Sequence, residues 1–410
     1  MSVSTAGSPA ALDTRVDAYA KKALVASALG YAMDGFDLLI LGFMLGDIRK
    51  DLNLGAVEAN WLVTMTLIGA VIGGILFGQL ADRMGRVKVL SWTILLFAVF
   101  TGLCGFAQGF WDLLIYRTLA GLGLGGEFGI GMALVAEAWP AAKRARASSY
   151  VGLGWQAGVL VAGLATIYLK PIIGWRGMFL LGLLPAVVSF LIRRRVGEPK
   201  AFTEKANAGS SFPLGLLVKD GETTRKSIGM FILCSVQNFG YYGIMIWMPN
   251  YLASQFNFGV TKSVTWTLVT VLGMAFGIWL FGHLADRFGR KPIFTLYMVG
   301  AAAMVLVYSR LTNENDLLIY GAIMGLFVNG MLGGYGALMS ELYPTEARAT
   351  AQNVLFNLGR GVGGFGPVVI GSIAATYSIS VAIGLLAVIY LVDLAALWIC
   401  IPERKGAELA

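Results

Sequence analysis

The sequence contains Gly78-Gln-Leu-Ala-Asp82-Arg83-Met-Gly85-Arg86, which returns 204 positions later as Gly282-His-Leu-Ala-Asp286-Arg287-Phe-Gly289-Arg290. Two further matches share this offset. Asp112-Leu-Leu-Ile-Tyr116 returns as Asp316-Leu-Leu-Ile-Tyr320, and Glu137, Pro140 and Arg144 return as Glu341, Pro344 and Arg348. Three matches in one register indicate that the two halves of the chain are copies of one structural unit.

The composition places both copies in a membrane. Of the 410 residues, 57% are apolar and 13% are charged, and the mean hydropathy is +0.73. Soluble domains are about 25% charged, so this chain has too little polar surface to remain in water. The composition therefore excludes a soluble globular protein, a disordered chain and a disulfide scaffold.

Few side chains of the kinds that enzymes use are present. Cys104, Cys234 and Cys400 lie far apart in apolar runs without a Cys-x-x-Cys spacing, which is typical of buried, inert thiols. His283 is the only histidine, so neither a His-rich metal site nor a Ser-His-Asp triad can form. We therefore expect no catalytic residues, no metal and no cofactor, and the chain is predicted not to be an enzyme.

Apolar runs of about 20 residues, long enough to cross about 30 Å of hydrocarbon as a helix, occur twelve times. The first is expected to be retained, because no charged n-region and apolar core of a cleavable signal precede it. The predicted fold is an all-α membrane protein of twelve transmembrane helices in two pseudo-symmetric six-helix bundles. The predicted spans lie near 23–46, 58–80, 88–108, 112–138, 148–169, 175–193, 227–252, 262–285, 292–310, 316–341, 352–375 and 380–401.

The basic residues orient these spans. Most of the 31 lysines and arginines fall on one side of the membrane if the N-terminus is cytoplasmic, so the positive-inside rule places both termini in the cytoplasm. This bias explains the net charge of +8, so we expect contact with the lipid bilayer of the cell (inner) membrane and no nucleic-acid partner. The predicted divisions are a cytoplasmic segment at 1–22, an N-terminal bundle at 23–193, a cytoplasmic linker at 194–226, a C-terminal bundle at 227–401 and a cytoplasmic tail at 402–410.

The repeated Gly-x-Leu-Ala-Asp-Arg-x-Gly-Arg stretch resembles the signature loop of the major facilitator superfamily, and the resemblance covers about 23–401. Within that superfamily, the chain is similar to sialate:proton symporters and related organic-acid symporters. The resemblance implies a secondary transporter that is complete as a monomer and whose halves rock about a central site. The similar stretches are Ala32-Met-Asp34-Gly-Phe-Asp37, Arg117-x-x-x-Gly121-x-Gly123-x-Gly125-Gly126-Glu127, Glu137-x-Trp-Pro140 and Gly174-Trp-Arg176.

The resemblance also implies that the signature loops form a latch, made in one conformation and broken in the other. Asp82 and Asp286 sit where a carboxylate can face a helix N-terminus or a neighbouring arginine; a solvated, positively charged turn is the alternative interpretation. Glu137 and Glu341 lie at equivalent helix ends, which favours a gate or cap role. The predicted gating residues are Gly78, Asp82, Arg83, Gly85, Arg86, Glu137, Arg144, Gly282, Asp286, Arg287, Gly289, Arg290, Glu341 and Arg348.

Charged residues inside the predicted spans carry the functional hypothesis, since a buried charge is costly unless it is paired or faces water. Asp34 and Asp37 share one face of the first helix, about 16 and 21 Å above the inner boundary. Arg117 in the fourth helix lies near 22 Å on the same estimate. Two carboxylates in a low dielectric do not both ionise easily. We expect Asp37 to pair with Arg117 while Asp34 carries the coupling proton; alternatively, both acids only hold the two helices together.

Two further charges fall inside predicted spans. Glu127 lies about 80° from Arg117 around the fourth helix, so it needs a partner on another helix or carries a proton itself. Arg360 sits among glycines with no carboxylate near it in the sequence. We expect Arg360 to bind the carboxylate of an anionic substrate. Pairing of Arg360 with Glu127, Asp34 or Asp393 as a gate is the alternative.

Arg117 and Arg360 are predicted to face a central cavity from the two halves of the chain. Asn238 is the repeat counterpart of Asp34, so proton chemistry is expected in the N-terminal half, at Asp34, Asp37 and Glu127. Polar and aromatic residues of other helices complete the predicted substrate site: Gln156, Gln237, Asn238, Tyr241, Tyr242, Asn329, Tyr335, Asn353 and Asn357.

These observations predict a proton-coupled importer of a small organic anion, such as a sugar acid, a monocarboxylate or an aromatic acid, with the proton as coupling ion. A proton-coupled exporter of drugs or metabolites is the first alternative. The fifth helix lacks the Gly-Pro pair of drug antiporters in the superfamily, so antiport is less favoured. A membrane receptor that binds a metabolite without moving it is the alternative of another class.

Overall fold

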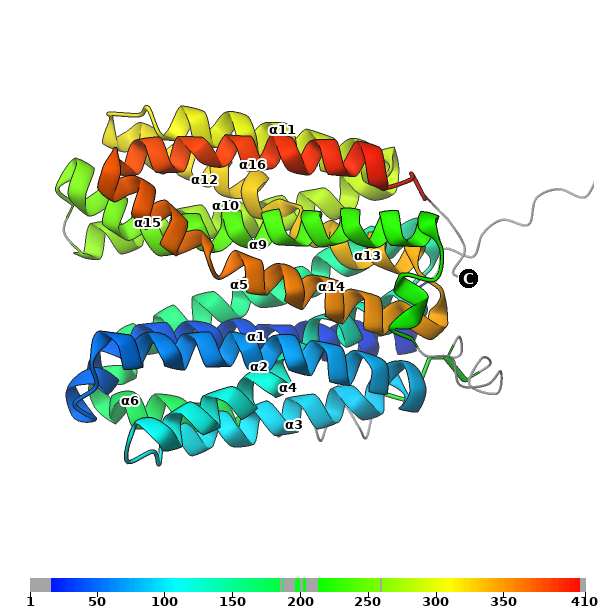
Figure 1. Cartoon of the computed structure of the whole chain (residues 1–410), viewed down its shortest axis with the longest axis horizontal. Helices are drawn as coiled ribbons and strands as arrows, with labels where there is room; N and C mark the ends of the chain where they lie inside the picture. The colour runs from blue at the N-terminus through cyan, green and yellow to red at the C-terminus, as the bar shows by residue number, and fades with distance from the viewer. Residues whose placement is uncertain are drawn as a thin grey trace, which may run out of the picture.

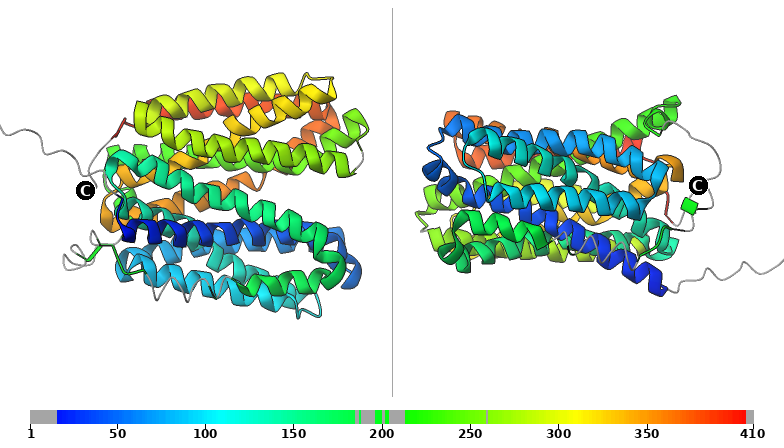
Figure 2. Two further views of the ribbon diagram at one scale, coloured as in Figure 1. Left: turned by 180° about the vertical axis from the view of Figure 1, so that it is seen from behind. Right: turned by 90° about the horizontal axis from the view of Figure 1, so that it is seen from below.

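The computed structural model describes residues 16–184, 187, 196–199, 202–203, 213–258 and 260–405, and these residues form helices without a strand. Figures 1 and 2 show the helices gathered in two elongated bundles that lie side by side. The N-terminal bundle contains α1 (Ala18–Asp51), α2 (Ala56–Met84), α3 (Arg86–Cys104), α4 (Phe110–Ala138), α5 (Arg144–Tyr168) and α6 (Lys170–Leu180).

The C-terminal bundle repeats this arrangement with more breaks. Single turns of 3₁₀ helix at 141–143, 181–183, 215–217 and 345–347 connect or extend the helices of both bundles. The C-terminal helices are α9 (Gly221–Phe256), α10 (Val260–Phe288), α11 (Arg290–Tyr308), α12 (Glu314–Gly330), α13 (Leu332–Leu342), α14 (Arg348–Gly363), α15 (Gly366–Thr376) and α16 (Ile379–Cys400).

Eleven helical segments within the described residues are long and apolar enough to cross a membrane, and the predicted all-α membrane fold is confirmed. The sixth predicted span, 175–193, lies partly outside the described residues. So do parts of the predicted N-terminal segment, linker and tail, namely 1–15, 194–195, 200–201, 204–212 and 406–410.

Two predicted spans are each divided into two helices. The span at 316–341 contains α12 and α13, which meet at Met331, and the span at 352–375 contains α14 and α15. Pro367 stands in the first turn of α15, where a residue without a backbone N–H is tolerated but cannot continue the preceding helix. The continuous hydropathy of these segments does not reveal such breaks.

Polar residues set the ends of the long apolar helices. Asp17 accepts a hydrogen bond from the backbone N of Ala20 at 2.7 Å, and Asp220 accepts one from the backbone N of Thr223 at 2.7 Å. Each bond satisfies one of the N–H groups that a helix start leaves without an internal partner. Asn257, with φ of 55°, ends α9 in the left-handed conformation, which asparagine tolerates better than most residues.

Glycines allow α2 and α4 to touch through their backbones. A Cβ atom on Gly73 would lie 1.9 Å from the carbonyl oxygen of Leu122, and one on Gly125 would lie 2.0 Å from that of Ala70. The equivalent helices of the second bundle repeat the contact, since a Cβ on Gly277 would lie 2.2 Å from a carbonyl oxygen of α12. Close contact between small residues is a main source of helix association in membranes.

Six helices form the main contacts between the two bundles. α14 of the C-terminal bundle packs against α2 and α4, and α5 of the N-terminal bundle packs against α10 and α13. In Figure 1, α14 and α5 lie between the two bundles. We call the end of the molecule that carries Ala18 and Cys400 the terminal face, and the other end the opposite face.

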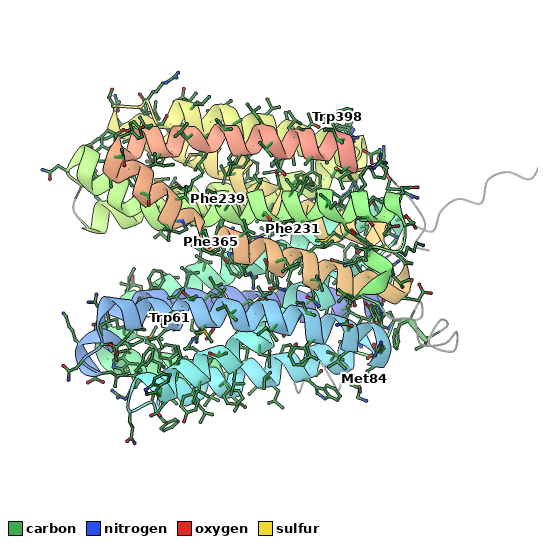
Figure 3. The ribbon with its side chains drawn as sticks, in the orientation of Figure 1. Trp61, Met84, Phe231, Phe239, Phe365 and Trp398 are labelled. Carbon is green, nitrogen blue, oxygen red and sulfur yellow. The ribbon has the colours of Figure 1, made fainter. Side chains whose placement is uncertain are left out.

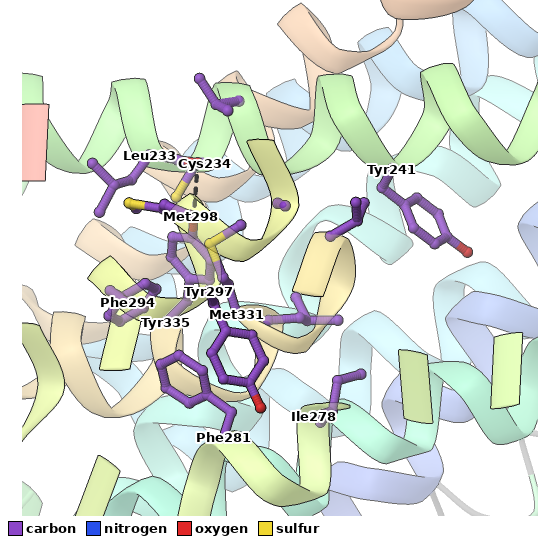
Figure 4. Packing of buried hydrophobic residues seen from close by; sticks show 14 of the residues in the cluster. Leu233, Cys234, Tyr241, Ile278, Phe281, Phe294, Tyr297, Met298, Met331 and Tyr335 are labelled. Carbon is purple, nitrogen blue, oxygen red and sulfur yellow. Dashed lines mark hydrogen bonds between the residues drawn. The ribbon is translucent and has the colours of Figure 1, made fainter. Parts of the chain in front are cut away.

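The outer surface and the interior of the bundles are both apolar. Trp61 and Trp398 are 50% and 59% exposed and lie on the outside of the two bundles, as Figure 3 shows. Such exposed apolar surface suits contact with lipid. Inside the C-terminal bundle, the rings of Phe281, Phe294 and Tyr335 pack edge to face (Figure 4).

The backbone contact between α2 and α4 predicts that Gly125→Ala destabilises the protein. The added methyl group would collide with Ala70, so the helices must separate, at a cost of about 1–3 kcal/mol. Gly46→Ala is the matched control, because a Cβ there meets nothing within 4 Å. We expect a lower melting temperature for Gly125→Ala and an unchanged melting temperature for Gly46→Ala. Equal losses in the two variants would contradict the close packing.

Candidate functional site

The ion pair between Asp37 of α1 and Arg117 of α4 is bidentate. Arg117 Nη1 donates to Asp37 Oδ1 at 3.0 Å, and Nη2 donates to Oδ2 at 2.7 Å. Thr101 of α3 donates a third hydrogen bond to Asp37 at 2.7 Å. Both charged side chains are buried. The pair expected from helix depth is therefore present, and it joins three helices of one bundle.

Asp34, one turn before Asp37 on α1, has a different environment. It is fully buried, and neither carboxylate oxygen has a hydrogen-bond partner among the described residues. The nearest cation is Arg360 of α14, whose Nη2 lies 4.0 Å from Asp34 Oδ2. This distance is too long for a hydrogen bond but short enough for a strong charge interaction. Asp34 and Arg360 belong to different bundles, so the contact crosses between them.

A small cavity lies beside Arg360. Both bundles contribute to its wall, since Tyr31 comes from α1 and Trp155 from α5, whereas the other lining residues come from the C-terminal bundle. Six predicted substrate-site residues are part of the wall. The lining residues are Tyr31, Trp155, Gln237, Asn238, Tyr241, Tyr242, Asn329, Leu332, Phe356 and Arg360.

Aromatic rings form much of this wall, and three of them, Tyr31, Trp155 and Phe356, were not predicted from the sequence. The rings of Tyr31 and Trp155 lie 5.3 Å apart, and the guanidinium of Arg360 lies 5.6 Å from the Trp155 ring and 5.4 Å from the Phe356 ring. Trp155 Nε1 donates to the hydroxyl of Tyr241 at 3.0 Å. The arrangement holds a buried cation against flat apolar surfaces, which favours an anion with an apolar or planar body.

Two amides supply polar groups to the cavity. Gln237 Nε2 donates to Asn329 Oδ1 at 2.6 Å. Gln237 Oε1 and Asn329 Nδ2 have no partner among the described residues. One acceptor and one donor are therefore free for a bound molecule.

Five other predicted substrate-site residues do not line the cavity: Arg117, Gln156, Tyr335, Asn353 and Asn357. Asn353 accepts a hydrogen bond from Gly129 N at 2.8 Å, and Asn357 donates one to Gly125 O at 2.7 Å. These two bonds join α14 to α4 and so connect the bundles. Tyr335 instead donates to the carbonyl of Leu233 within the C-terminal bundle, at 2.9 Å (Figure 4).

Glu127 finds its partner on a neighbouring helix of the same bundle. Thr93 Oγ1 of α3 donates to Glu127 Oε1 at 2.9 Å. Glu127 Oε2 lies against Gly30 of α1, where a Cβ atom would be only 2.5 Å away. The carboxyl is buried between three helices with a hydroxyl and no cation as its hydrogen-bond partner. Its use as a proton carrier stays a prediction.

The signature-loop aspartates bind helix N-termini of the opposite bundle. Asp82 accepts from the backbone N of Ala349 at 3.1 Å and of Thr350 at 2.7 Å, at the start of α14. Asp286 accepts equivalent bonds from the start of α5, at 3.0 and 3.1 Å. Carboxylates at helix N-termini are favoured by the free N–H groups and the helix dipole. Both loops therefore join the two bundles at the terminal face.

Buried ion pairs surround these loops in two equivalent sets. Glu137 of the N-terminal bundle lies 2.9 Å from Arg348 of the C-terminal bundle, and Glu341 lies 3.1 Å from Arg144. Within each bundle, Arg86 contacts Asp82 at 2.9 Å and Glu137 at 3.1 Å, and Arg290 contacts Asp286 at 3.2 Å and Glu341 at 2.7 Å. Ion pairs therefore link the two bundles at the terminal face.

The remaining predicted gating residues separate into close contacts and exposed charges. A Cβ on Gly282 would lie 2.2 Å from Ser149 of the opposite bundle, and one on Gly78 would lie 3.0 Å from Thr350. Gly85 and Gly289 have φ of 112° and 107°, values that only glycine adopts without strain. Arg83 and Arg287 are exposed and make no ion pair with a described residue.

Two residues that bind the signature loops, Glu198 and Glu403, were not predicted from the sequence. Glu198 accepts hydrogen bonds from the backbone N of Arg86, Val87 and Lys88 at 2.7, 3.2 and 3.0 Å. Glu403 accepts bonds from the start of α11, at 3.1 and 2.8 Å. The chain following each bundle is thus bound to that bundle's own signature loop. The similarity of Glu198-Pro-Lys to Glu403-Arg-Lys, one position out of the repeat register, is the signal that could have revealed them.

Comparison with known proteins gives consistent matches over most of the chain. The family model described as Major Facilitator Superfamily matches residues 27–280 and 230–409. A Haemophilus influenzae protein assigned to metabolite transport is 62% identical over 406 residues, covering 97% of this chain and 100% of that protein. The sialic acid transporter NanX of Escherichia coli is 29% identical, covering 90% of this chain and 91% of its own length.

A solved structure has the same fold. The proton:xylose symporter XylE bound to 6-bromo-6-deoxy-D-glucose superposes with a TM-score of 0.81, covering 96% of this chain and 98% of that chain. The two sequences are 18% identical, so the match establishes the shared architecture alone.

The bidentate pair predicts that Asp37→Asn strongly destabilises the protein, because Arg117 would be left buried without a counter-ion. The expected cost is about 3–5 kcal/mol, read as a large fall in melting temperature. Asp51→Asn is the control, because Asp51 pairs with Arg176 at the surface, where ion pairs contribute about 1 kcal/mol or less. The double variant Asp37→Asn/Arg117→Gln is expected to recover part of the loss. No difference between Asp37→Asn and Asp51→Asn would refute this role.

Proposed function

The chain belongs to the Major Facilitator Superfamily, and we propose that it imports a small organic anion together with protons. The family membership makes it a multi-pass membrane transporter of small molecules rather than an enzyme. The observation that carries the finer proposal is the 4.0 Å approach of Arg360, which lines the cavity, to Asp34 of the other bundle. The sequence analysis gave two alternative roles for Arg360, binding the substrate carboxylate and pairing with an acid such as Asp34. We propose that Arg360 has both roles, in different states of the transport cycle.

Arg360 has unused hydrogen-bonding capacity. Its Nε and Nη1 atoms have no partner among the described residues, although the side chain is buried and lines the cavity. A carboxylate can form two parallel charge-assisted bonds with a guanidinium, and each such arrangement uses Nη2, the atom that lies 4.0 Å from Asp34. The lining residues leave only a small space beside Arg360 in this conformation, so the proposed ligand is a small molecule.

Asp34 couples this binding to a proton. While Asp34 is ionised, it occupies the positive field of Arg360 and competes with an incoming carboxylate. When Asp34 takes up a proton, Arg360 is released for the substrate. The carboxylates of Asp34 and of the substrate therefore do not compete for the same guanidinium. Protonation of Asp34 and binding of the anion therefore favour each other, as linkage requires. The name of NanX, a transporter of a sugar acid, supports the choice of an anion.

The cross-bundle bonds at the terminal face support an alternating-access cycle. With Asp82, Asp286, Glu137 and Glu341 engaged, the cavity is closed toward that face. Breaking these bonds would let the bundles rock about the cavity. We place the terminal face in the cytoplasm and the protein in the inner membrane, and since one chain supplies both sides of the cavity, the monomer is the proposed unit.

The Asp34–Arg360 contact predicts carboxylate binding that strengthens as the pH falls, because protonation of Asp34 removes a competitor from Arg360. This binding is measured by thermal-shift assays at several pH values, with N-acetylneuraminate, gluconate, benzoate and lactate as ligands. Arg360→Ala is expected to weaken binding by about 10- to 100-fold, which corresponds to the free energy that one hydrogen bond to a charged group contributes. Asp34→Asn is expected to bind equally well at every pH.

Arg176→Ala is the control, since Arg176 pairs with Asp51 at the opposite face and its loss is expected to leave binding unchanged. Stabilisation by organic cations with silence from every carboxylate would overturn the anion assignment. Unchanged affinity in Arg360→Ala would remove Arg360 from the site.

The latch predicts that Asp286→Asn opens the terminal face, because the neutral amide loses its ion pair with Arg290 and its charged bonds to α5. A cysteine placed at Ser149, which is fully buried, reports the opening by its rate of alkylation in a variant without the native cysteines. We expect a several-fold faster rate with Asp286→Asn. Glu314→Gln, at the opposite face, is the control. An unchanged alkylation rate would contradict the latch.

A further inference from the structure

The C-terminal bundle contains a buried carboxyl group that takes no part in the transport scheme above. Asp393 lies on α16 in the C-terminal bundle, seven residues before the helix ends at Cys400. It is fully buried, and neither of its oxygens has a hydrogen-bond partner among the described residues. No described cation forms an ion pair with it. The group therefore holds no neighbouring helix through a bond, which a purely structural carboxyl would do.

The helices packed against α16 bring no positive charge to Asp393. α9, α11 and α15 pack against α16, and α15 has no charged residue. The cations of α9 are Arg225, which is exposed, and Lys226, which pairs with Glu222. Those of α11 are Arg290, which binds Glu341, and Lys291, which donates to the carbonyls of Trp398 and Ile401 near the terminal face. The titratable groups in the electrostatic field of Asp393 are Cys234, Tyr335 and Tyr390, all neutral acids.

A proton is the cation that such a site can bind. An ionised carboxylate without a partner or water costs several kcal/mol inside a membrane protein, whereas the neutral acid costs far less. A metal ion would need several oxygen, nitrogen or sulfur ligands, and the described residues contain no cluster of three acidic, histidine or cysteine side chains. A single carboxyl group is sufficient for a proton.

A hydroxyl and a glycine lie next to the carboxyl. Tyr390 is one turn earlier on the same face of α16, and its buried hydroxyl also has no hydrogen-bond partner among the described residues. That hydroxyl sits over Gly240 of α9, where a Cβ atom would lie 2.1 Å away. α9 also carries Gln237 and Tyr241, which line the cavity. One helix therefore separates the carboxyl from the substrate cavity.

We propose that Asp393 is a second, exchangeable proton-binding site, located in the C-terminal bundle and independent of the Asp34–Arg360 pair. Asn238 is the repeat equivalent of Asp34, so the first helix of the C-terminal bundle has no acid at this position. It has an acid on its last helix instead. Any use of this site in transport rests on the proposed proton coupling, whereas its existence does not.

Infrared difference spectroscopy of the purified full-length protein in lipid nanodiscs tests the site without a substrate. The carbonyl stretch of a protonated carboxyl group is followed while the buffer is titrated from acidic to alkaline and exchanged from H₂O to D₂O. Asp393→Asn removes the acid with almost no change of shape, so folding is expected to be preserved and is checked by melting temperature. Asp34→Asn, the matched substitution in the other bundle, is measured in parallel.

We expect a protonated-carboxyl band that shifts in D₂O and disappears reversibly when the carboxyl group loses its proton at alkaline pH. The band is expected to be absent from Asp393→Asn and present in Asp34→Asn. A spectrum that Asp393→Asn leaves unchanged would overturn the proposal, since Asp393 would then be ionised. A band that neither exchanges nor discharges while the protein stays folded would also overturn it. The Asp393 band can be absent while carboxylate binding still depends on Asp34, so the two proposals fail separately.

Discussion

A charge enclosed by a membrane protein needs a partner, water or a proton, because the bilayer provides no other compensation. The buried charges of this chain satisfy the constraint to different degrees. Asp37 and Arg117 satisfy it completely, through two short hydrogen bonds. Asp34 and Arg360 satisfy it only in part, at 4.0 Å. The incomplete pair joins the two bundles, and its Arg360 lines the cavity. We propose that this difference makes the pair available for binding an anion and a proton.

The duplicated unit has kept its terminal face and changed its midplane. The aspartates of both signature loops, with Glu137 and Glu341, make equivalent contacts in the two halves. The midplane charges have no such counterparts, since Asp34, Arg117 and Arg360 correspond to Asn238, Gly321 and Gln156. We propose that symmetry at the latch would let both bundles open about one axis. The asymmetry at the midplane places the carboxyl of Asp34 on one bundle and the cation of Arg360 on the other.

The sequence predicts the fold because the repeat, the span lengths and the charge bias each carry independent information. It also predicts the Asp37–Arg117 pair, since depth along a helix follows from a fixed rise per residue. Rotation about the axis is harder to obtain, because a helix that is apolar on all sides has no periodic signal. For this reason Tyr31, Trp155 and Phe356 were missed as cavity residues, and Asn353 and Asn357 bind α4 instead.

Accumulation of the carboxylate identified by binding, measured in proteoliposomes with an imposed pH gradient, tests the coupling of anion and proton through Asp34 and Arg360 most directly. The wild type is expected to concentrate the anion when the outside is acidic. Asp34→Asn is expected to exchange the anion across the membrane without concentrating it. Accumulation by Asp34→Asn equal to that of the wild type, or indifference of the wild type to the gradient, would contradict the account.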